Sequence, residues 1–421
     1  MMLDSNVKEL KWAIMASGGI CAEFVGDLLL DPKTRGAEDV QHTVVAVASE
    51  SGKAPGFVAK MYTEDRKEES EKIKTYNNYS EMLVDPNVEI VYIASPQSHH
   101  YRHVKLCLDA GKHVLCEKPF TLNGKQAKAL CDLAKQKQLF LMEARWTKFF
   151  QLFKEVKKLL HENRAIGKIY RVHSDFGERL PENHRLFDKD LGGGSLLDIG
   201  IYPLTYISMM LWDHPENQRT PPTVRSALRM NKEAGVDEDA MVNMTFDKID
   251  ATGLLTSNIR VDLFRSGHHT IVYGTDGHLT ISGTHTSRPT SYTLYRKGER
   301  PKEFTPSLPG WGMMWEADEC ARCIRDGRLE SSEMSHGECA SKCGVARATN
   351  LADFMWWGSR RGNGVRHDNS GRGSSTGKLP VSGGPGACRL IMRRLRRRGV
   401  LRFTCLCVEI AWLCSYLRGL A

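Results

Sequence analysis

The sequence predicts an α/β domain with a doubly wound parallel sheet, followed by an α+β domain with a mostly antiparallel, open sheet. In residues 8–145, short and mostly apolar runs alternate with helical segments, as in βαβ units whose strands are covered on both faces. In residues 146–350, strand-like segments follow one another with short turns between them. A chain of 421 residues is also long for a single hydrophobic core.

The first domain is expected to contain five strands with helices between them. The apolar runs that we assign to strands cover residues 12–15, 43–49, 90–95, 114–116 and 140–142. The segments with helical spacing cover residues 22–30, 100–110 and 126–136. Parallel sheets of this kind bind ligands at the carboxyl ends of their strands, so the functional residues are sought there.

The second domain is expected to begin with helices and to continue as a sheet. Helices are predicted over residues 152–161 and 195–212. Strands are predicted over residues 224–230, 241–246, 253–259, 270–273, 279–281 and 291–295. Asp276 and Gly277 form a dipeptide that is typical of a tight hairpin turn. Such a succession of strands predicts antiparallel pairing.

The basic residues are concentrated in the last part of the chain. The formal net charge is +9, but residues 358–421 alone carry 13 Lys and Arg against two acidic residues. The preceding part is therefore close to neutral and gives no electrostatic reason to expect nucleic-acid binding. Residues 358–421 are rich in Gly, Arg and Ser and lack periodicity, so we expect them to be disordered or not a native part of the protein.

Neither a membrane nor a metal site is predicted. No stretch approaches the ~18 consecutive apolar residues of a membrane span, and no secretory signal is apparent, so a cytoplasmic protein with reduced thiols is expected. Cys320 and Cys323 are followed by Cys339 and Cys343 at nearly the spacing of a zinc ribbon. The first pair falls within a predicted helix that ends at Gly327, whereas zinc-binding pairs normally lie on tight turns.

The first strand is followed by a glycine-containing loop, MASGGICAEF. Against the pattern G-x-G-x-x-G, only Gly18 matches, and Ala16 and Cys21 replace the other two glycines. The position between a strand and a helix is where a dinucleotide pyrophosphate binds, so Ser17, Gly18, Gly19 and Ile20 are candidate cofactor ligands. A tight turn in an ordinary α/β protein explains the same letters equally well.

The ends of the second and fourth strands supply further candidates. After the second strand, Glu50 favours the ribose hydroxyl of NAD, whereas Ser49, Ser51 and Lys53 favour the 2′-phosphate of NADP. The fourth strand ends in IASPQSHH, where Ser95, Pro96 and His100 are expected at the cofactor cleft. The choice between NADP and NAD stays open on these residues alone.

The segment HVLCEKPFTLN resembles the Glu-Lys-Pro signature of the glucose–fructose oxidoreductase/inositol dehydrogenase family. The segments WAIMASGGI, IASPQSHHYRHV, FLMEARWTKFF and GGGSLLDIGIYPL resemble the same family. The resemblance implies an N-terminal Rossmann domain that binds NAD or NADP. It also implies that Lys118 reaches the reaction centre and that Pro119 follows a cis peptide bond. Glu117 is expected to orient the lysine or to bind the cofactor ribose.

Asp198 and Tyr202 narrow the resemblance further. They are four residues apart, so on one helix they would share a face. With a tyrosine at this second position, the segment resembles the matching segment of the dimeric dihydrodiol dehydrogenases and the fungal D-xylose 1-dehydrogenases. A phenol with a pKa of about 10 is a poor base, but a nearby ammonium lowers its pKa. We therefore expect Tyr202 as the catalytic base, Lys118 as its electrostatic partner and Asp198 as a positioning acceptor.

Further aromatic and basic residues are candidates for the substrate side of the site. Trp146 and Phe176 could form apolar walls against a sugar ring, and packing between the domains accounts for them equally well. His184 and Arg185 are cleft candidates without an assigned role.

The sequence therefore predicts an NADP-preferring oxidoreductase, with NAD as the alternative cofactor. The expected reaction is oxidation of D-xylose to D-xylono-1,5-lactone. The rival is oxidation of a trans-dihydrodiol to a catechol. A non-catalytic nucleotide-binding regulator would be expected to lack Lys118 or Tyr202, and both are present. A homodimer formed through the second sheet is expected by analogy with the family, with no nucleic-acid or membrane partner.

Overall fold

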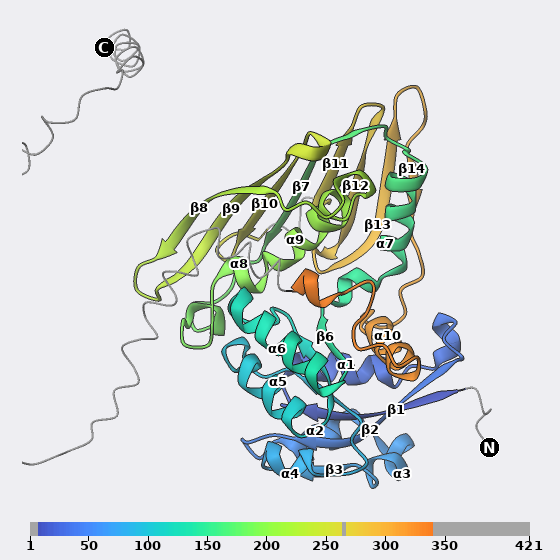
Figure 1. Ribbon diagram of the computed structural model, residues 1–421, viewed down its shortest axis with the longest axis vertical. Helices are drawn as coiled ribbons and strands as arrows, with labels where there is room; N and C mark the ends of the chain where they lie inside the picture. Colours follow the sequence, from blue (N-terminus) through green and yellow to red (C-terminus); the bar gives the residue numbers. More distant parts are fainter. Residues whose placement is uncertain (1–6, 263–266, 340–421) are drawn as a thin grey trace, which may run out of the picture. The chain divides into compact units, whose positions relative to one another are not determined.

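The computed structural model describes residues 7–262 and 267–339, which form two sheets with helices packed on them (Figure 1). The first sheet has six parallel strands in the order β3-β2-β1-β4-β5-β6. Its strands are β1 (Lys8–Met15), β2 (Val40–Ala48), β3 (Lys74–Tyr76), β4 (Ile90–Ile93), β5 (His113–Glu117) and β6 (Leu141–Ala144). This is the strand order of a dinucleotide-binding fold, and the predicted parallel sheet is confirmed.

The strands of the first sheet are apolar because helices cover them. Every residue of β4 and of β6 is buried. The helices are α1 (Gly19–Leu28), α2 (Ala54–Met61), α3 (Lys67–Ser70), α4 (Tyr79–Leu83), α5 (His100–Asp109) and α6 (Gly124–Lys137). Strand β3 was not predicted, because it has only three residues and no apolar run. All five predicted strands are present, with ends that differ by a few residues.

The second sheet has eight strands in the order β14-β13-β12-β11-β7-β10-β9-β8. Only β7 and β10 pair in parallel; the other neighbours are antiparallel, as predicted. Its strands are β7 (Ile169–Gly177), β8 (Thr223–Asn231), β9 (Val236–Phe246), β10 (Ala251–Asn258), β11 (Thr270–Gly274), β12 (Gly277–His285), β13 (Arg288–Arg296) and β14 (Lys302–Phe304). The predicted hairpin at Asp276 and Gly277 joins β11 to β12.

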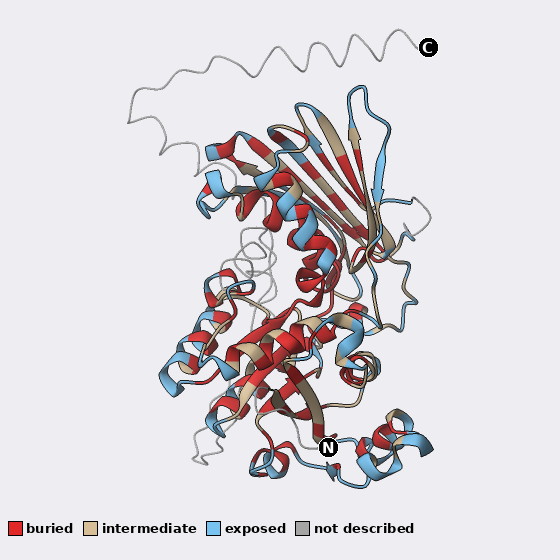
Figure 2. Cartoon of the chain, turned by 90° about the vertical axis from the view of Figure 1, so that its right-hand side faces the viewer, coloured by how far each residue is buried: buried red, intermediate tan, exposed pale blue. Residues whose placement is uncertain are grey.

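One face of the second sheet is packed and the other is open. Helix α7 (Gln151–Lys157) contacts β13, and α9 (Ile201–Ile207) contacts β7 and β10. Figure 2 shows buried and less buried residues alternating along these strands. In β10, for example, every second residue is buried. The predicted open sheet is therefore confirmed.

The predicted helix over residues 195–212 is broken, which corrects the expectation that Asp198 and Tyr202 share one helix. Helix α8 (Ser195–Asp198) ends before Ile199, α9 follows, and a π-helical turn covers Ser208–Trp212. Pro203 accounts for the break, because proline lacks the N–H that would continue the helical ladder and is tolerated in a helix only within its first turn. Predicted helix 152–161 likewise divides into α7 and a π-helical turn, Lys158–Glu162.

Helix α10 (Met314–Arg325) returns to the first sheet and contacts β1 and β2. This helix lies within the range 146–350 that we assign to the second domain, and it contains Cys320 and Cys323 as buried thiols. Within residues 7–262 and 267–339, no helix is long and apolar enough to cross a membrane. The same residues contain no group of three or more His, Cys, Asp or Glu placed to hold a metal. The predicted tail, residues 358–421, lies outside the described part of the chain, as does Cys343.

A buried carboxylate anchors the start of α10. Asp27 of α1 accepts hydrogen bonds from the backbone N–H groups of Trp311, Gly312 and Met313 at 2.8, 2.8 and 2.7 Å. Gly312 has a φ of 98°, and a Cβ there would lie 2.4 Å from the ring of Phe150, so the turn requires glycine. Asp27 therefore ties a distant part of the chain to the first sheet.

Replacing Asp27 with alanine should lower the free energy of unfolding by about 3 kcal/mol, because it leaves buried N–H groups without an acceptor. Urea unfolding followed by circular dichroism measures this change. The control is Asp31→Ala, which removes an exposed carboxylate that caps a single N–H, of Lys33, and should cost about 1 kcal/mol or less. Equal losses for the two variants would contradict the anchoring role of Asp27.

Candidate active site

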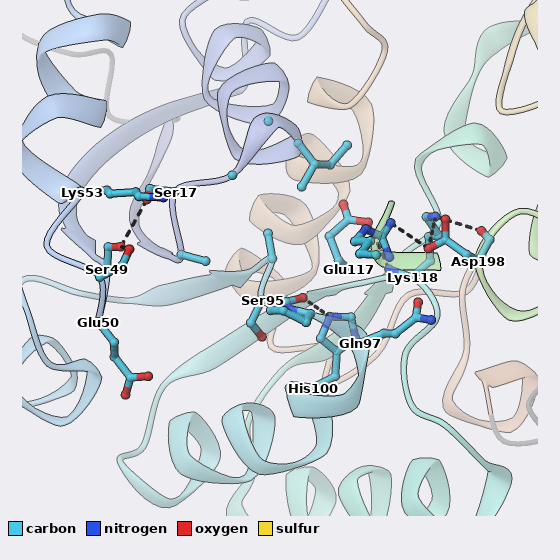
Figure 3. Close-up of a pocket in the computed structure, with 18 of the residues that line it drawn as sticks. Ser17, Ser49, Glu50, Lys53, Ser95, Gln97, His100, Glu117, Lys118 and Asp198 are labelled. Atoms are coloured by element: carbon cyan, nitrogen blue, oxygen red, sulfur yellow. Dashed lines mark hydrogen bonds and ion pairs between the residues drawn. The ribbon is translucent and has the colours of Figure 1, made fainter. Parts of the chain in front are cut away.

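A cavity of about 730 Å³ lies at the carboxyl ends of the parallel strands. It is lined by the loop after β1, the ends of β2, β4 and β5, and the region of α8 and α9. Every residue predicted to bind the cofactor lines it: Ser17, Gly18, Gly19, Ile20, Ser49, Ser51, Ser95, Pro96, His100, Glu117 and Lys118. Lining residues that the sequence reasoning missed are Tyr79, Ala94 and Gln97. Figure 3 shows one group of labelled side chains around Ser17 and another around Lys118.

The loop after β1 fits an anionic group. Helix α1 begins after Gly18 without a side chain that caps its N-terminus. A Cβ added at Gly18 or Gly19 would meet no atom within 4 Å, so the backbone there faces open space. A helix N-terminus with exposed N–H groups attracts phosphate. Ala16 adopts a φ of 86°, which glycine takes without strain and which costs alanine on the order of 1 kcal/mol.

The end of β2 presents hydroxyl, acidic and basic groups. The Ser49 hydroxyl is 3.3 Å from that of Ser17 and 3.0 Å from that of Ser51. Figure 3 shows Lys53 extended toward Ser17, while Glu50 points to the opposite side of Ser49. Lys53 also lines an adjoining hollow, together with Lys60 of α2. Lys53 and the hydroxyls of Ser17, Ser49 and Ser51 therefore line the part of the cavity where a 2′-phosphate would lie, and Lys60 lines the adjoining hollow.

The end of β4 is joined to the turn after β5 by His100. Its ring nitrogens lie 2.9 Å from the carbonyl oxygens of Ser95 and Pro119. Burial lowers the pKa of His100, although the two carbonyl oxygens oppose the shift. The Ser95 hydroxyl lies 2.8 Å from Nδ1 of His103. Ser95 and His100 are thus bonded within the protein and fix the shape of the cavity floor.

Lys118 brings the end of β5 to the end of α8. The Lys118–Pro119 peptide bond is cis, as the resemblance implied. The ammonium donates to the backbone oxygen of Asp198 at 2.9 Å and lies 3.4 Å from its Oδ1. It also lies 5.0 Å from the centre of the Tyr202 ring. Arg185 donates to the same carboxylate oxygen of Asp198 at 3.0 Å.

The charges of these groups stabilise one another. Burial raises the pKa of Asp198, but the Lys118 and Arg185 cations outweigh it and hold that pKa below its usual value. Burial lowers the pKa of Lys118, but Asp198 and Tyr202 outweigh it and hold the pKa above its usual value. Asp198 and Lys118 therefore stand as an ion pair beside Tyr202.

The pKa of Tyr202 differs from the sequence-based expectation. Lys118 lowers this pKa, as expected, but the burial of the phenol has a larger effect and raises it to about 12. The sequence could not reveal this, because the degree of burial of a side chain depends on the complete fold. A base at this position therefore needs a further positive charge or hydrogen-bond donor.

Trp146 and Phe176 do not line the cavity; they pack behind Tyr202. Both are buried, at 4% and 3% exposure. The Trp146 indole donates a hydrogen bond to the phenol oxygen of Tyr202 at 3.1 Å. Contact of these two residues with a sugar stays a prediction. Arg185 lines the cavity, whereas His184 is not among its lining residues and accepts a hydrogen bond from the N–H of Leu186 at 3.3 Å.

Glu117 is a buried carboxylate beneath Lys118. The Tyr92 hydroxyl donates to its Oε1 at 2.6 Å, and the backbone N–H of Lys118 donates to its Oε2 at 3.1 Å. Burial raises the pKa of Glu117 to about 7, although Lys118 and both hydrogen bonds oppose the shift. Its charge therefore changes near neutral pH.

Two family models match the chain. One is described as an oxidoreductase family with an NAD-binding Rossmann fold and matches residues 11–144. The other, the GFO/IDH/MocA C-terminal domain, matches residues 153–280. The chain belongs to the GFO/IDH/MocA oxidoreductase family. The predicted family, the Rossmann domain and the prediction of an oxidoreductase are confirmed.

Two similar proteins with known names are dehydrogenases. The chain is 38% identical over 359 residues to D-xylose 1-dehydrogenase (NADP(+)) of Hypocrea jecorina, covering 79% of this chain and 89% of the relative. It is 33% identical over 337 residues to trans-1,2-dihydrobenzene-1,2-diol dehydrogenase of Danio rerio, covering 79% and 93%. The crystal structure of aldose-aldose oxidoreductase from Caulobacter crescentus, complexed with glycerol, has the same fold, with a TM-score of 0.67 and 23% identity over 84% of this chain and 98% of that one.

Replacing Glu117 with glutamine should make stability less dependent on pH. The pKa of Glu117 in the folded protein, about 7, lies above its usual value of 4.5, so its stabilising contribution is complete below pH 4.5 and is lost as the pH rises through 7. The unfolding free energy of Glu117→Gln relative to wild type should therefore increase by about 2 kcal/mol between pH 5 and pH 8.

Urea unfolding at the two pH values measures this difference. Asp109→Asn is the control, because Lys105 and Lys137 hold the pKa of Asp109 below its usual value of 3.8, outside this range, and Asp109 is not among the groups that shift the pKa of Glu117. A Glu117→Gln difference that is the same at pH 5 and pH 8 would show that the carboxylate does not titrate as stated.

Proposed function

We propose that the protein is an NADP-dependent dehydrogenase that oxidises a ring hydroxyl of a sugar, namely D-xylose to D-xylono-1,5-lactone. The observation that carries the proposal is the convergence of Lys118, Asp198 and Tyr202 at one end of a cavity whose other end is the glycine loop of a Rossmann domain. The similarity to a D-xylose 1-dehydrogenase over 79% of the chain supports the substrate class.

Residues that line the cavity fit three parts of the proposed cofactor: its pyrophosphate, its 2′-phosphate and its nicotinamide ribose. The uncapped N-terminus of α1, with Gly18 and Gly19, would hold the pyrophosphate. Lys53, with the hydroxyls of Ser49 and Ser51, would hold the 2′-phosphate, while Glu50, which also lines the cavity, directs its carboxylate away from Ser49. These contacts favour NADP over NAD. Glu117 would lie near the nicotinamide ribose, at the end of β5.

The chain's own residues would manage the proton of the substrate hydroxyl. When bound, the oxidised nicotinamide supplies a hydride acceptor and a positive charge. In its phenolate form, Tyr202 would take the hydroxyl proton as the substrate carbon loses its hydride. The Lys118 ammonium, 5.0 Å from the phenol ring, favours the phenolate. Asp198 would hold that ammonium in place through its backbone and carboxylate oxygens.

The assay that tests the function follows nicotinamide absorbance with NADP and NAD, each combined with D-xylose, D-glucose and a trans-dihydrodiol. D-Xylose with NADP should give the highest kcat/KM. A higher kcat/KM for the trans-dihydrodiol would contradict D-xylose as the substrate. It would support the rival reaction, for which the similarity to dihydrodiol dehydrogenases is the observation in favour.

Lys118→Met and Tyr202→Phe should each lower kcat by at least about 100-fold, the usual size of an acid–base contribution, with cofactor affinity largely kept. Isothermal titration with NADP checks the affinity separately. Tyr206→Phe is the matched control: Tyr206 lies one turn further along α9, donates to the backbone oxygen of Thr286 and is absent from the cavity lining, so turnover should persist. Full turnover in Tyr202→Phe would refute the proposed base.

We also propose that the protein forms a homodimer through the open face of the second sheet. The strand register places Met241 of β9 and Tyr273 of β11 on this face, and they are 52% and 41% exposed. Analytical ultracentrifugation should give about twice the 47.4 kDa of one chain, and Met241→Glu should give one chain. A wild-type protein that sediments as a monomer would contradict the proposal.

A further inference from the structure

The environment of the Tyr202 oxygen contains a donor that is not part of the proposed lysine–tyrosine pair. Trp146 Nε1 lies 3.1 Å from the phenol oxygen, and the two rings stand nearly perpendicular at 87°. Both side chains are buried, with 4% and 5% exposure. The Lys118 ammonium, in contrast, lies over the ring rather than at the oxygen. The indole is therefore the group that bonds directly to the reacting atom of the proposed base.

A phenol oxygen can accept hydrogen bonds and donate its own proton. The indole N–H can only donate, so Tyr202 must be the acceptor in this pair. Among the residues that the structure describes, no acceptor is bonded to the Tyr202 hydroxyl. Tyr202 lines the cavity, whereas Trp146 does not. The phenol proton is therefore left to point into the cavity, where a substrate hydroxyl would lie.

We propose that Trp146 is a positioning residue for the reaction: its indole N–H holds the phenol oxygen of Tyr202, directs the hydroxyl toward the cavity and stabilises the phenolate that oxidation requires. This inference rests on the proposed role of Tyr202 as the base. It assigns to Trp146 a role through Tyr202 instead of direct contact with a sugar ring.

The surroundings of Trp146 keep its donor in place. The residue lies in a 3₁₀ turn, Trp146–Phe149, directly after β6. Its ring packs edge-to-face with that of Phe150, with the ring centroids 5.5 Å apart. Phe150 packs in the same way with Trp315 of α10, with the centroids 5.3 Å apart. The next residue, Thr147, donates to the backbone oxygen of Ser287 at 2.5 Å. Because packing already immobilises the indole ring, its hydrogen bond to Tyr202 costs little additional side-chain entropy.

Phe176 provides a matched comparison within the same site. It also packs against the Tyr202 ring, with centroids 5.7 Å apart, and it is equally buried. Its ring has no hydrogen-bond donor. A purely structural role would make the two aromatic residues equivalent, while a hydrogen-bonding role affects only Trp146.

The test compares Trp146→Phe, Trp146→His and Phe176→Leu. Each is made with natural Tyr202 for kinetics, and with 3,5-difluorotyrosine at position 202, so that the ¹⁹F signals of the two ring fluorines report the ionisation of this phenol without turnover. Trp146→Phe should raise the ¹⁹F midpoint by about one pH unit, because it removes a donor to the phenolate. It should lower kcat for D-xylose near neutral pH by about tenfold, with KM little changed.

Phe176→Leu should leave the ¹⁹F midpoint unchanged, and Trp146→His, which restores a ring N–H, should return the midpoint toward wild type. An unchanged midpoint in Trp146→Phe would overturn the inference while leaving Tyr202 available as the base. A raised midpoint with unaltered kcat would mean that Tyr202 is not the base, so the inference would fail together with that part of the proposed function. Full turnover in the single variant Tyr202→Phe would contradict the proposed base itself, independently of the result for Trp146.

Discussion

The contact between the Lys118 ammonium and Asp198 holds the site together, because it joins the end of β5 to the end of α8. A charge that is largely buried must be paired and hydrogen-bonded, or the fold loses several kcal/mol. The break in the predicted helix makes the pairing possible. In a continuous helix, the N–H of Tyr202 would bond to the Asp198 carbonyl; here it bonds to Ile199 at 3.2 Å, and the Asp198 carbonyl accepts from Lys118. The interruption between α8 and α9 therefore supplies an acceptor for the lysine.

The same arrangement sets two opposing demands on Tyr202. Burial against Trp146 and Phe176 fixes the ring, and it also makes the phenolate costly, which is why the pKa rises to about 12. Positive charge and donors must offset that cost. Lys118 acts through space over the ring, and Trp146 acts directly at the oxygen. In the proposed reaction, Lys118, Trp146 and the positive charge of the bound cofactor would together stabilise the Tyr202 phenolate.

Local patterns in the sequence predicted the fold because its strands are short apolar runs and its helices have clear ends. They also predicted which loops meet, since the carboxyl ends of parallel strands share one edge of the sheet. The missed features depend on tertiary contacts. Strand β3 is defined by its pairing with β2 rather than by its three residues. The return of α10 to β1 involves contacts with residues far away in the sequence, such as the bond between Asp27 and Trp311 and the ion pair between Arg35 and Asp318. The shifted pKa of Tyr202 depends on which side chains cover it. None of these can be read from neighbouring residues.

Glu117 gives the site a dependence on pH that partly opposes the chemistry. In the oxidation of an alcohol, a higher pH favours loss of the proton from Tyr202. As the pH passes about 7, however, Glu117 becomes charged, and a negative charge there raises the pKa of Tyr202. The two effects have opposite signs, so the gain in phenolate per pH unit is smallest where Glu117 titrates. The buried carboxylate that supports the backbone of Lys118 thus limits how strongly the base responds to alkaline conditions.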